Sequence, residues 1–502
     1  MPEFSINFGP LAADEPAFRN PGIIRALNLV PRSSSFGPMR ALAAQSNNAL
    51  TARALGGLSA RSAANVTYVY AGDAAKLYEM VGQTFTDESK GGGYSTAADD
   101  VWEFAVWAGS NKVIATNYTN PVQSIAVGGG GAGAFADMIT STNVPKAKHL
   151  GIVGNFVVLG FTNDAGDGEK SNRVWWSAID DETDFDPSAA TQCDYEDLST
   201  GGQVQKIVGN ADYGLIFQAD MVRSMRYTGA GTIFSLQPLN FTPGTFVPNS
   251  VVSFENETFY IAEEGFMALR GLQAEHLGDR LVDRFFLSQF DPSNARLVSS
   301  AIDPANKLVA WAFPGTDNTG LPNRILMCKY DDRPAKWAEA EIDTEVLLTS
   351  QTQGYTLDGL DAIGTNIDDA AVFDESFDSS KWQGGAFRFG AFDQTHTLSF
   401  FNGPTLSAVI DTGDILPVEG KSWRINGVRP LVDGGGACAS VAPRKRLQDS
   451  ISYGPPSEMN ANGVCKLRSE GKYQRIRVSL SSSTSWSHFQ GIAVDGTIRG
   501  AR

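Results

Sequence analysis

The chain has little cysteine, little histidine and no long apolar run, and each shortage excludes a class of protein. Only four cysteines occur among 502 residues and none forms a Cys-x-x-Cys pair, which excludes a disulfide scaffold and a zinc ribbon. The histidines His149, His276, His396 and His488 are far apart, so no metal-binding helix is indicated. No segment approaches the roughly 18 apolar residues needed to cross a bilayer. We expect no membrane segment, no metal and no cofactor.

Patterns of export and of catalysis are missing as well. The first twenty residues have neither a basic start nor an apolar core, so we expect no signal peptide. The glycine-rich stretch 128–133 lacks the Lys-Ser/Thr of a P-loop, and no Gly-x-Ser-x-Gly elbow occurs. The acidic stretch 180–186 lacks EF-hand spacing. We expect no enzyme and no catalytic residue, although 56 acidic residues leave a glycosidase-type carboxylate pair open.

What the chain does have is 52 glycines between short apolar runs, which is typical of an all-β protein. Between residues 65 and 343 a group of three or four strand-like runs recurs about every 40 to 50 residues, the size of a β-propeller blade. One small sheet cannot bury both of its faces, whereas a ring of sheets buries each sheet against the next. We predict a propeller of about six blades over residues 65–345. A two-sheet sandwich, single or stacked, is the alternative.

The two ends of the chain differ from its middle in charge. Residues 1–65 carry six basic and three acidic residues, a net charge of +3, and residues 438–502 carry ten and four, a net charge of +6. Because the whole chain has −16, residues 66–437 have −25. We predict an N-terminal arm over 1–64 and a C-terminal β-domain over 346–502, which together build a smaller antiparallel platform. Its basic charge suits an acidic partner surface, and a chance distribution of solvated charges is the alternative.

Five basic residues near the C-terminus are the candidate contacts of this platform. Arg444, Lys445 and Arg446 are consecutive, and Arg475 and Arg477 alternate with apolar residues in a predicted strand over 473–480. We predict that they contact an adaptor protein or a neighbouring subunit. For residues 444–446, a solvated loop is the alternative.

Several segments resemble the tail nozzle proteins of short-tailed bacteriophages, also called packaged-DNA stabilisation or tail tubular protein B-like proteins. The segments are 20–22 (NPG), 26–31 (ALNLVP), 36–38 (FGP), 69–78 (VYAGDAAKLY), 174–178 (VWWSA), 468–478 (RSEGKYQRIRV) and 486–492 (WSHFQGI). They lie at both ends and in the middle of the chain, and none is a catalytic motif. Their shared order carries the resemblance.

The resemblance implies a structural protein of the virion tail that is assembled in the host cytoplasm. Six copies would form a ring below the portal and its head-to-tail adaptor, retain the packaged genome and conduct it during ejection. Implied partners are the other copies of the homo-hexamer, the adaptor, tail needle, fibre or tailspike proteins, and double-stranded DNA that passes without sequence-specific binding. An acidic propeller agrees with this role because like charges repel DNA.

Two other functions stay open. One is a carbohydrate-binding or glycan-hydrolysing propeller at the phage or cell surface. The other is a tail hub or baseplate component with the same propeller.

Overall fold

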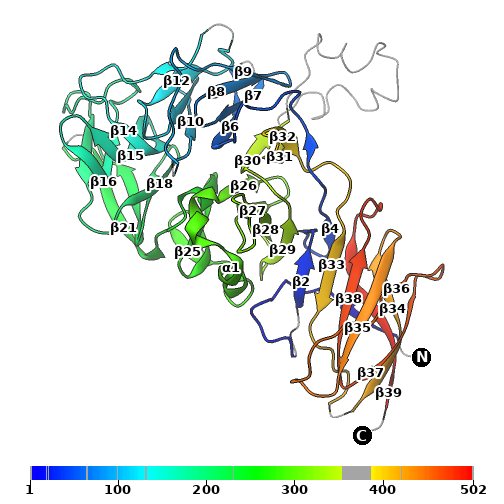
Figure 1. Cartoon of the computed structure of the whole chain (residues 1–502). Helices are drawn as coiled ribbons and strands as arrows, with labels where there is room; N and C mark the ends of the chain where they lie inside the picture. Colours follow the sequence, from blue (N-terminus) through cyan, green and yellow to red (C-terminus); the bar gives the residue numbers. More distant parts are fainter. Residues whose placement is uncertain are drawn as a thin grey trace.

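The structure is a computed structural model that describes residues 3–18, 20, 22–63, 66–98, 100–130, 133–229, 231–352, 386–419 and 421–499. Strands dominate it: this part of the chain holds 39 strands, one short α-helix, α1 (Asp283–Gln289), and the 3-10 helices η1 (Pro248–Ser250) and η2 (Pro292–Leu297). Figure 1 shows a ring of small sheets and, beside it, a body that holds both chain ends. The all-β prediction is confirmed.

Six blades of the ring are each built from one continuous stretch of sequence, because each is an antiparallel meander of consecutive strands. Blade 1 holds β6 (Gly56–Arg61), β7 (Thr67–Gly72), β8 (Leu77–Val81) and β9 (Thr84–Asp87); blade 2 holds β10 (Glu103–Trp107), β11 (Lys112–Thr116), β12 (Gln123–Ala126) and β13 (Ala136–Asp137). Blade 3 holds β14 (Lys146–Val153), β15 (Phe156–Asp164), β16 (Gly168–Trp176) and β17 (Asp194–Asp197); blade 4 holds β18 (Val204–Gly209), β19 (Gly214–Gln218), β20 (Met221–Tyr227) and β21 (Phe234–Pro243). Blade 5 holds β22 (Val252–Phe254), β23 (Glu257–Ala262), β24 (Gly265–Arg270) and β25 (Gln273–His276); blade 6 holds β26 (Ser299–Asp303), β27 (Leu308–Phe313), β28 (Arg324–Lys329) and β29 (Lys336–Glu341).

A seventh blade closes the ring and combines two distant parts of the chain. Its strands are β30 (Val346–Gln351), β31 (Phe387–Phe392), β32 (Leu398–Phe400) and, from the N-terminal arm, β5 (Ala43–Ala44). Its inner strand β30 packs against β26 of blade 6 and β6 of blade 1, so every blade has two neighbours. The propeller is confirmed, and its seven blades correct the count of about six.

The predicted boundaries of the propeller are wrong at both ends. Blade 1 begins at Gly56, before residue 65, and the strands of residues 346–351 and 387–400 belong to blade 7 and not to a separate C-terminal domain. The reason is that blade 7 is completed by β5, whose two alanines give no strand pattern of their own in the sequence.

The remaining strands form a β-sandwich from both chain ends, here called the terminal module (residues 3–42 and 401–499), as predicted for the smaller domain. One sheet has the order β3 (Leu29–Pro31), β4 (Phe36–Pro38), β39 (Phe489–Ile498), β34 (Trp423–Val432) and β37 (Cys465–Gly471), with β1 (Glu3–Asn7) paired to β39. The other has the order β2 (Ile23–Leu27), β33 (Ala408–Thr412), β38 (Tyr473–Leu480), β35 (Ala437–Arg444) and β36 (Ser457–Glu458). Apolar residues of both sheets share one buried cluster.

A continuous nine-stranded sheet joins the propeller to the terminal module, because β2 pairs in parallel with β29 of blade 6. Asn28 fixes this junction with a positive φ of 55°, a conformation that asparagine tolerates better than most residues. Its backbone N–H donates to the Glu339 carbonyl at 2.7 Å, its side-chain amide donates to the Ser407 carbonyl at 2.9 Å, and its side-chain oxygen accepts from the Glu341 N–H at 3.0 Å. The propeller and the module therefore share backbone hydrogen bonds and a core.

Candidate functional site

Two of the five predicted contact residues serve inside the terminal module. Arg444 and Arg475 are 7% and 9% exposed, and both form ion pairs with the buried Asp414. Arg444 also donates to the Leu447 carbonyl at 2.8 Å. Their prediction as contacts with another protein is corrected, because a buried carboxylate between β33 and β38 holds both guanidinium groups.

Arg477 is likewise bound internally, whereas Lys445 and Arg446 are not. The Nε and Nη2 atoms of Arg477 donate to the two carboxylate oxygens of Asp411 at 2.7 Å each, and this pairing raises the pKa of Arg477. The side chains of Lys445 and Arg446 are exposed, and their backbone N–H groups donate to the Asp449 carboxylate. The structure brings all five residues together on β35, β38 and the loop after β35, and leaves two of them available to a partner.

The axis of the propeller is lined by charged groups on the inner strands. The buried Glu103 of β10 lies 2.9 Å from His149 Nδ1 and 2.8 Å from Lys206 Nζ, and its second oxygen accepts from the Leu150 N–H at 3.1 Å. Burial alone would raise the pKa of Glu103, but Lys206 and His149 outweigh it and lower the pKa to about 2. Glu103 therefore stays ionised and has no proton to donate at neutral pH.

A second charged cluster lies on the same axis, nearer blade 7. Glu345 accepts a hydrogen bond from the Ala54 N–H at 2.9 Å and lies 2.6 Å from His396 Nδ1. Burial raises the pKa of Glu345, and the Ala54 N–H and His396 offset this only in part. Two adjoining cavities of about 320 and 180 Å³ lie on the axis beside these clusters.

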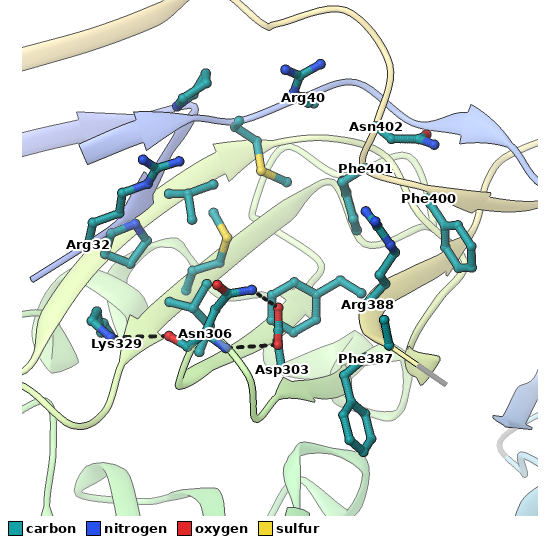
Figure 2. Close-up of a pocket in the computed structure, with 18 of the residues that line it drawn as sticks. Arg32, Arg40, Asp303, Asn306, Lys329, Phe387, Arg388, Phe400, Phe401 and Asn402 are labelled. Atoms are coloured by element: carbon teal, nitrogen blue, oxygen red, sulfur yellow. Dashed lines mark hydrogen bonds between the residues drawn. The ribbon is translucent and has the colours of Figure 1, made fainter. Parts of the chain in front are cut away.

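A depression of about 650 Å³ lies between blade 6, blade 7 and the β3–β4 hairpin, and is here called the basic groove. Its inner lining is apolar and comes from all three elements: Val30, Met39, Leu308, Met327, Phe389 and Phe401. Cationic side chains surround this lining: Arg32, Arg40, Lys329 and Arg388 (Figure 2). Val30 and Met39 pack into a core with residues of blades 6 and 7, and the groove lies beside this core.

The carboxylate in the lining of the groove, Asp303, stabilises a turn of the chain. Asp303 is 6% exposed and accepts from the backbone N–H of Asn306 at 3.1 Å and from its side-chain amide at 2.7 Å, as the dashed lines in Figure 2 show. The Asn306 carbonyl in turn accepts from Lys329 at 3.2 Å, and Lys329 also pairs with Asp331 at 2.8 Å. The charges of Asp303 and Lys329 are thus engaged locally, and the three arginines determine the sign of the groove.

The groove could not be predicted from the sequence because Arg388 is distant from Arg32 and Arg40 and meets them only when the ring closes. The alternation Phe387-Arg388-Phe389 was the one local signal, since it places aromatic side chains on one face of a strand and a cation on the other. In the part of the chain that the structure describes, no group of three or more His, Cys, Asp or Glu side chains could hold a metal ion, and no helix is long and apolar enough to span a membrane.

No family model and no curated protein matches the chain. Solved structures with a similar chain path include one from a nidogen/laminin complex, at 10% identity and a TM-score of 0.30 over 50% of this chain and 94% of that one. U3-55K is similar at 8% identity and a TM-score of 0.38 over 64% and 90%, and BamB from Moraxella catarrhalis at 7% and 0.33 over 80% and 97%. At these values the likeness carries no argument about function, and the fold rests on the chain's own sheets.

Proposed function

We propose that the chain is a structural, non-enzymatic subunit of a bacteriophage tail nozzle. Six copies form a ring in the virion tail below the portal and its adaptor, retain the packaged DNA and conduct it during ejection. The other proposed partners are tail needle, fibre or tailspike proteins, and the duplex passes without sequence-specific binding. The observation that carries the proposal is the nine-stranded sheet that continues from the propeller into the terminal module. A ring subunit under the pressure of packaged DNA needs its domains to be joined in this way.

The segments that resemble nozzle proteins support this proposal through the architecture that they stabilise. In the segment 69–78, the Asp73 carboxylate accepts from the Ala75 and Lys76 N–H groups at 2.8 and 2.7 Å and from the Tyr78 hydroxyl at 2.8 Å. In the segment 486–492, the Asp433 carboxylate accepts from the Ser487 and His488 N–H groups at 2.8 Å each. These contacts shape turns of blade 1 and of the terminal module, so a shared order of such segments is consistent with a shared fold.

The charge distribution indicates which surfaces of such a ring would repel DNA. Residues 43–400 hold 23 basic and 45 acidic residues, a net charge of −22, whereas the rest of the chain holds 17 and 11, a net charge of +6. The axial cavities of the propeller, of about 320 and 180 Å³, are too small for a DNA duplex. The conduit in our proposal therefore lies between the six copies, where acidic propeller surfaces repel phosphate groups, while the basic modules contact neighbouring proteins.

Mass photometry of the purified chain, alone and with the adaptor, tests this proposal. We expect a species of six chains, and we expect the double variant K445E/R446E to weaken its formation or its docking on the adaptor. The matched control K466E/R468E reverses two exposed charges on β37 in the other sheet of the same module. A particle that stays monomeric with and without the adaptor would contradict the proposal. Equal effects of the two variants would contradict the specific role of Lys445 and Arg446 as contacts and would leave the proposed ring unaffected.

Glycan binding at the axial cavity is a second candidate function, and the backbone favours it. Tyr118 and Phe161 both line this cavity with positive φ values of 63° and 52°, which aromatic residues rarely adopt and which concentrate at functional sites. Amide side chains that could bind sugar hydroxyls line the same cavity: Asn117, Gln203, Gln205 and Asn249. Hydrolysis by Glu103 does not fit, because a general acid needs a raised pKa and that of Glu103 is about 2.

Calorimetric titration with oligosaccharides from the host surface tests this second function. We expect measurable heat with the native chain and none with Tyr118→Ala. The control Tyr195→Ala removes a partly exposed tyrosine of the outer strand β17. Absence of heat, or equal heat with all three proteins, would exclude the axial cavity as a glycan site.

A further inference from the structure

We propose that the basic groove is a docking site for an acidic segment of a partner protein. The segment carries carboxylates that pair with the arginines of the rim and, between these carboxylates, an apolar side chain that enters the groove. The inference does not rest on the proposed ring, because a single copy of the chain contains the whole groove. It rests on the shape of the groove, its apolar lining and its unneutralised arginines.

The interior of the groove suits an apolar anchor. Its volume of about 650 Å³ is within the range of sites that enclose small ligands or single side chains, roughly 300–1,000 Å³. Met39, Met327 and Phe389 belong to the core that seals blade 6 against blade 7, so the groove opens directly onto packed apolar side chains. Methionine adapts to differently shaped partners because its side chain is unbranched and flexible.

The rim supplies three guanidinium groups that form no ion pair within the part of the chain that the structure describes. Arg388 and Arg40 are exposed, and the contact that fixes the Arg40 head group is a hydrogen bond to the Gly403 carbonyl at 3.3 Å. Arg32 lies beside the His488 ring, with its Nη1 atom 3.3 Å from the Nε2 atom of the histidine. A carboxylate that approached any of the three could form a charge-assisted, bidentate pair.

The three arginines of the groove are unusual because the propeller around them has a negative net charge. The propeller has a net charge of −22, so most of its surface repels acidic segments and nucleic acid alike. Only a ligand with a few carboxylates and an apolar side chain matches a local group of three arginines around an apolar lining. A nucleic acid would continue beyond the groove onto acidic surface, and its charge would be opposed there. We therefore assign the groove to a protein segment.

Fluorescence polarisation with a short fluorescein-labelled peptide, in which glutamate alternates with phenylalanine and leucine, tests the site on the full chain. We expect saturable binding to the native chain and at least a roughly tenfold weaker affinity for the double variant R40Q/R388Q. Both substitutions lie on exposed side chains, and an unchanged unfolding midpoint in urea would show that the fold is kept. The matched control R280Q removes an exposed arginine elsewhere on the propeller, with a side chain 80% accessible to solvent, and should leave the affinity unchanged.

Four results would overturn the assignment. The first is an equal affinity for the same peptide with glutamine in place of glutamate, and the second is an equal loss of affinity in R280Q. The third is tighter binding of oligothymidylate or oleate than of the peptide, because the groove would then serve a nucleic acid or a lipid. The fourth concerns the chain's own stretch 353–385, which carries seven acidic residues and one lysine. If the peptide binds only after a glycine-serine linker replaces this stretch, the groove has an occupant within the chain and not a partner.

Discussion

The propeller and the terminal module reach similar packing by opposite routes. Six of the seven blades are built from strands that follow one another in the sequence, so most of their hydrogen bonds are local. The module instead pairs strands from the two ends of the chain, as Glu3 opposite Asp495 shows. Local pairing tolerates a degenerate sequence repeat, whereas distant pairing depends on a few fixed points. We therefore expect single substitutions to be more damaging in the module and at its junction than in the blades.

The buried ion pairs sharpen this comparison most. In the module one carboxylate, Asp414, serves both Arg444 and Arg475, whereas in blade 3 three carboxylates serve Arg173: Asp164, Asp167 and Asp197. We expect Asp414→Ala to lower the free energy of unfolding by about 3–5 kcal/mol, because it leaves two buried cations unpaired. Asp197→Ala should lower it by only about 1 kcal/mol, because two partners remain. Urea unfolding followed by tryptophan fluorescence measures both, and equal losses would contradict the proposed difference.

Acid should lower the free energy of unfolding by protonating Glu103 at the propeller axis. The pKa of Glu103 is about 2 in the folded chain and near 4.3 in an unfolded one, so its ionised form stabilises the fold by roughly 3 kcal/mol above that unfolded value. Because the folded pKa is lowered, this contribution is lost as the pH falls from about 5 towards 2. The measurement is the unfolding free energy across this window for the native chain and for Glu103→Gln. The variant should show a shallower fall, and parallel curves would show that Glu103 does not contribute.

The junction between the two regions should depend on Asn28. We expect Asn28→Ala to lower the free energy of unfolding by about 2 kcal/mol, because alanine loses two side-chain hydrogen bonds and is strained at a φ of 55°. Asn28→Gly should cost about 1 kcal/mol, since glycine adopts this φ without strain. Thermal unfolding by calorimetry separates the two variants. A second transition in Asn28→Ala would show that the module then unfolds apart from the propeller, and identical curves for alanine and glycine would rule out backbone strain.

The smallest effect is expected where the ring closes. Ser46, just after β5, donates its hydroxyl to the Asn48 carbonyl at 2.8 Å and accepts from the Leu398 N–H of β32 at 3.2 Å. Ser46→Ala should lower the free energy of unfolding by about 1 kcal/mol, and the exposed Ser293→Ala should stay within about 0.5 kcal/mol of the native chain. Urea titrations of both variants measure this difference. No loss in Ser46→Ala would mean that the closing strand contributes little to stability.

The sequence predicted what is local and repeated in this fold. Glycine-punctuated apolar runs indicated the all-β class and the propeller, and the basic charge of both chain ends indicated the small domain that they form. Blade 7 was missed because its fourth strand is two alanines that lie more than 300 residues before their partners Ser399 and Phe400. Only the folded chain reveals such a pairing.

The candidate sites were harder to predict than the fold, for the same reason. Arg444 and Arg475 form a basic pattern in the sequence, but Asp414, which neutralises both, is at least 30 residues away and has no motif around it. The basic groove depends on arginines of two distant segments, Arg32 and Arg40 in the N-terminal arm and Arg388 in blade 7, so no single stretch of sequence predicted it. The net charge of whole regions could be predicted to matter from the sequence, whereas the ion-pair partner of each charged residue could not be predicted.

Electron cryomicroscopy of the purified chain with its adaptor, reconstructed without imposed symmetry, tests the central proposal most directly. The account predicts a ring of six copies around an open axis, with the terminal modules joining neighbouring proteins and each propeller closed along its own axis. A ring of another symmetry, or isolated copies that never associate, would contradict it.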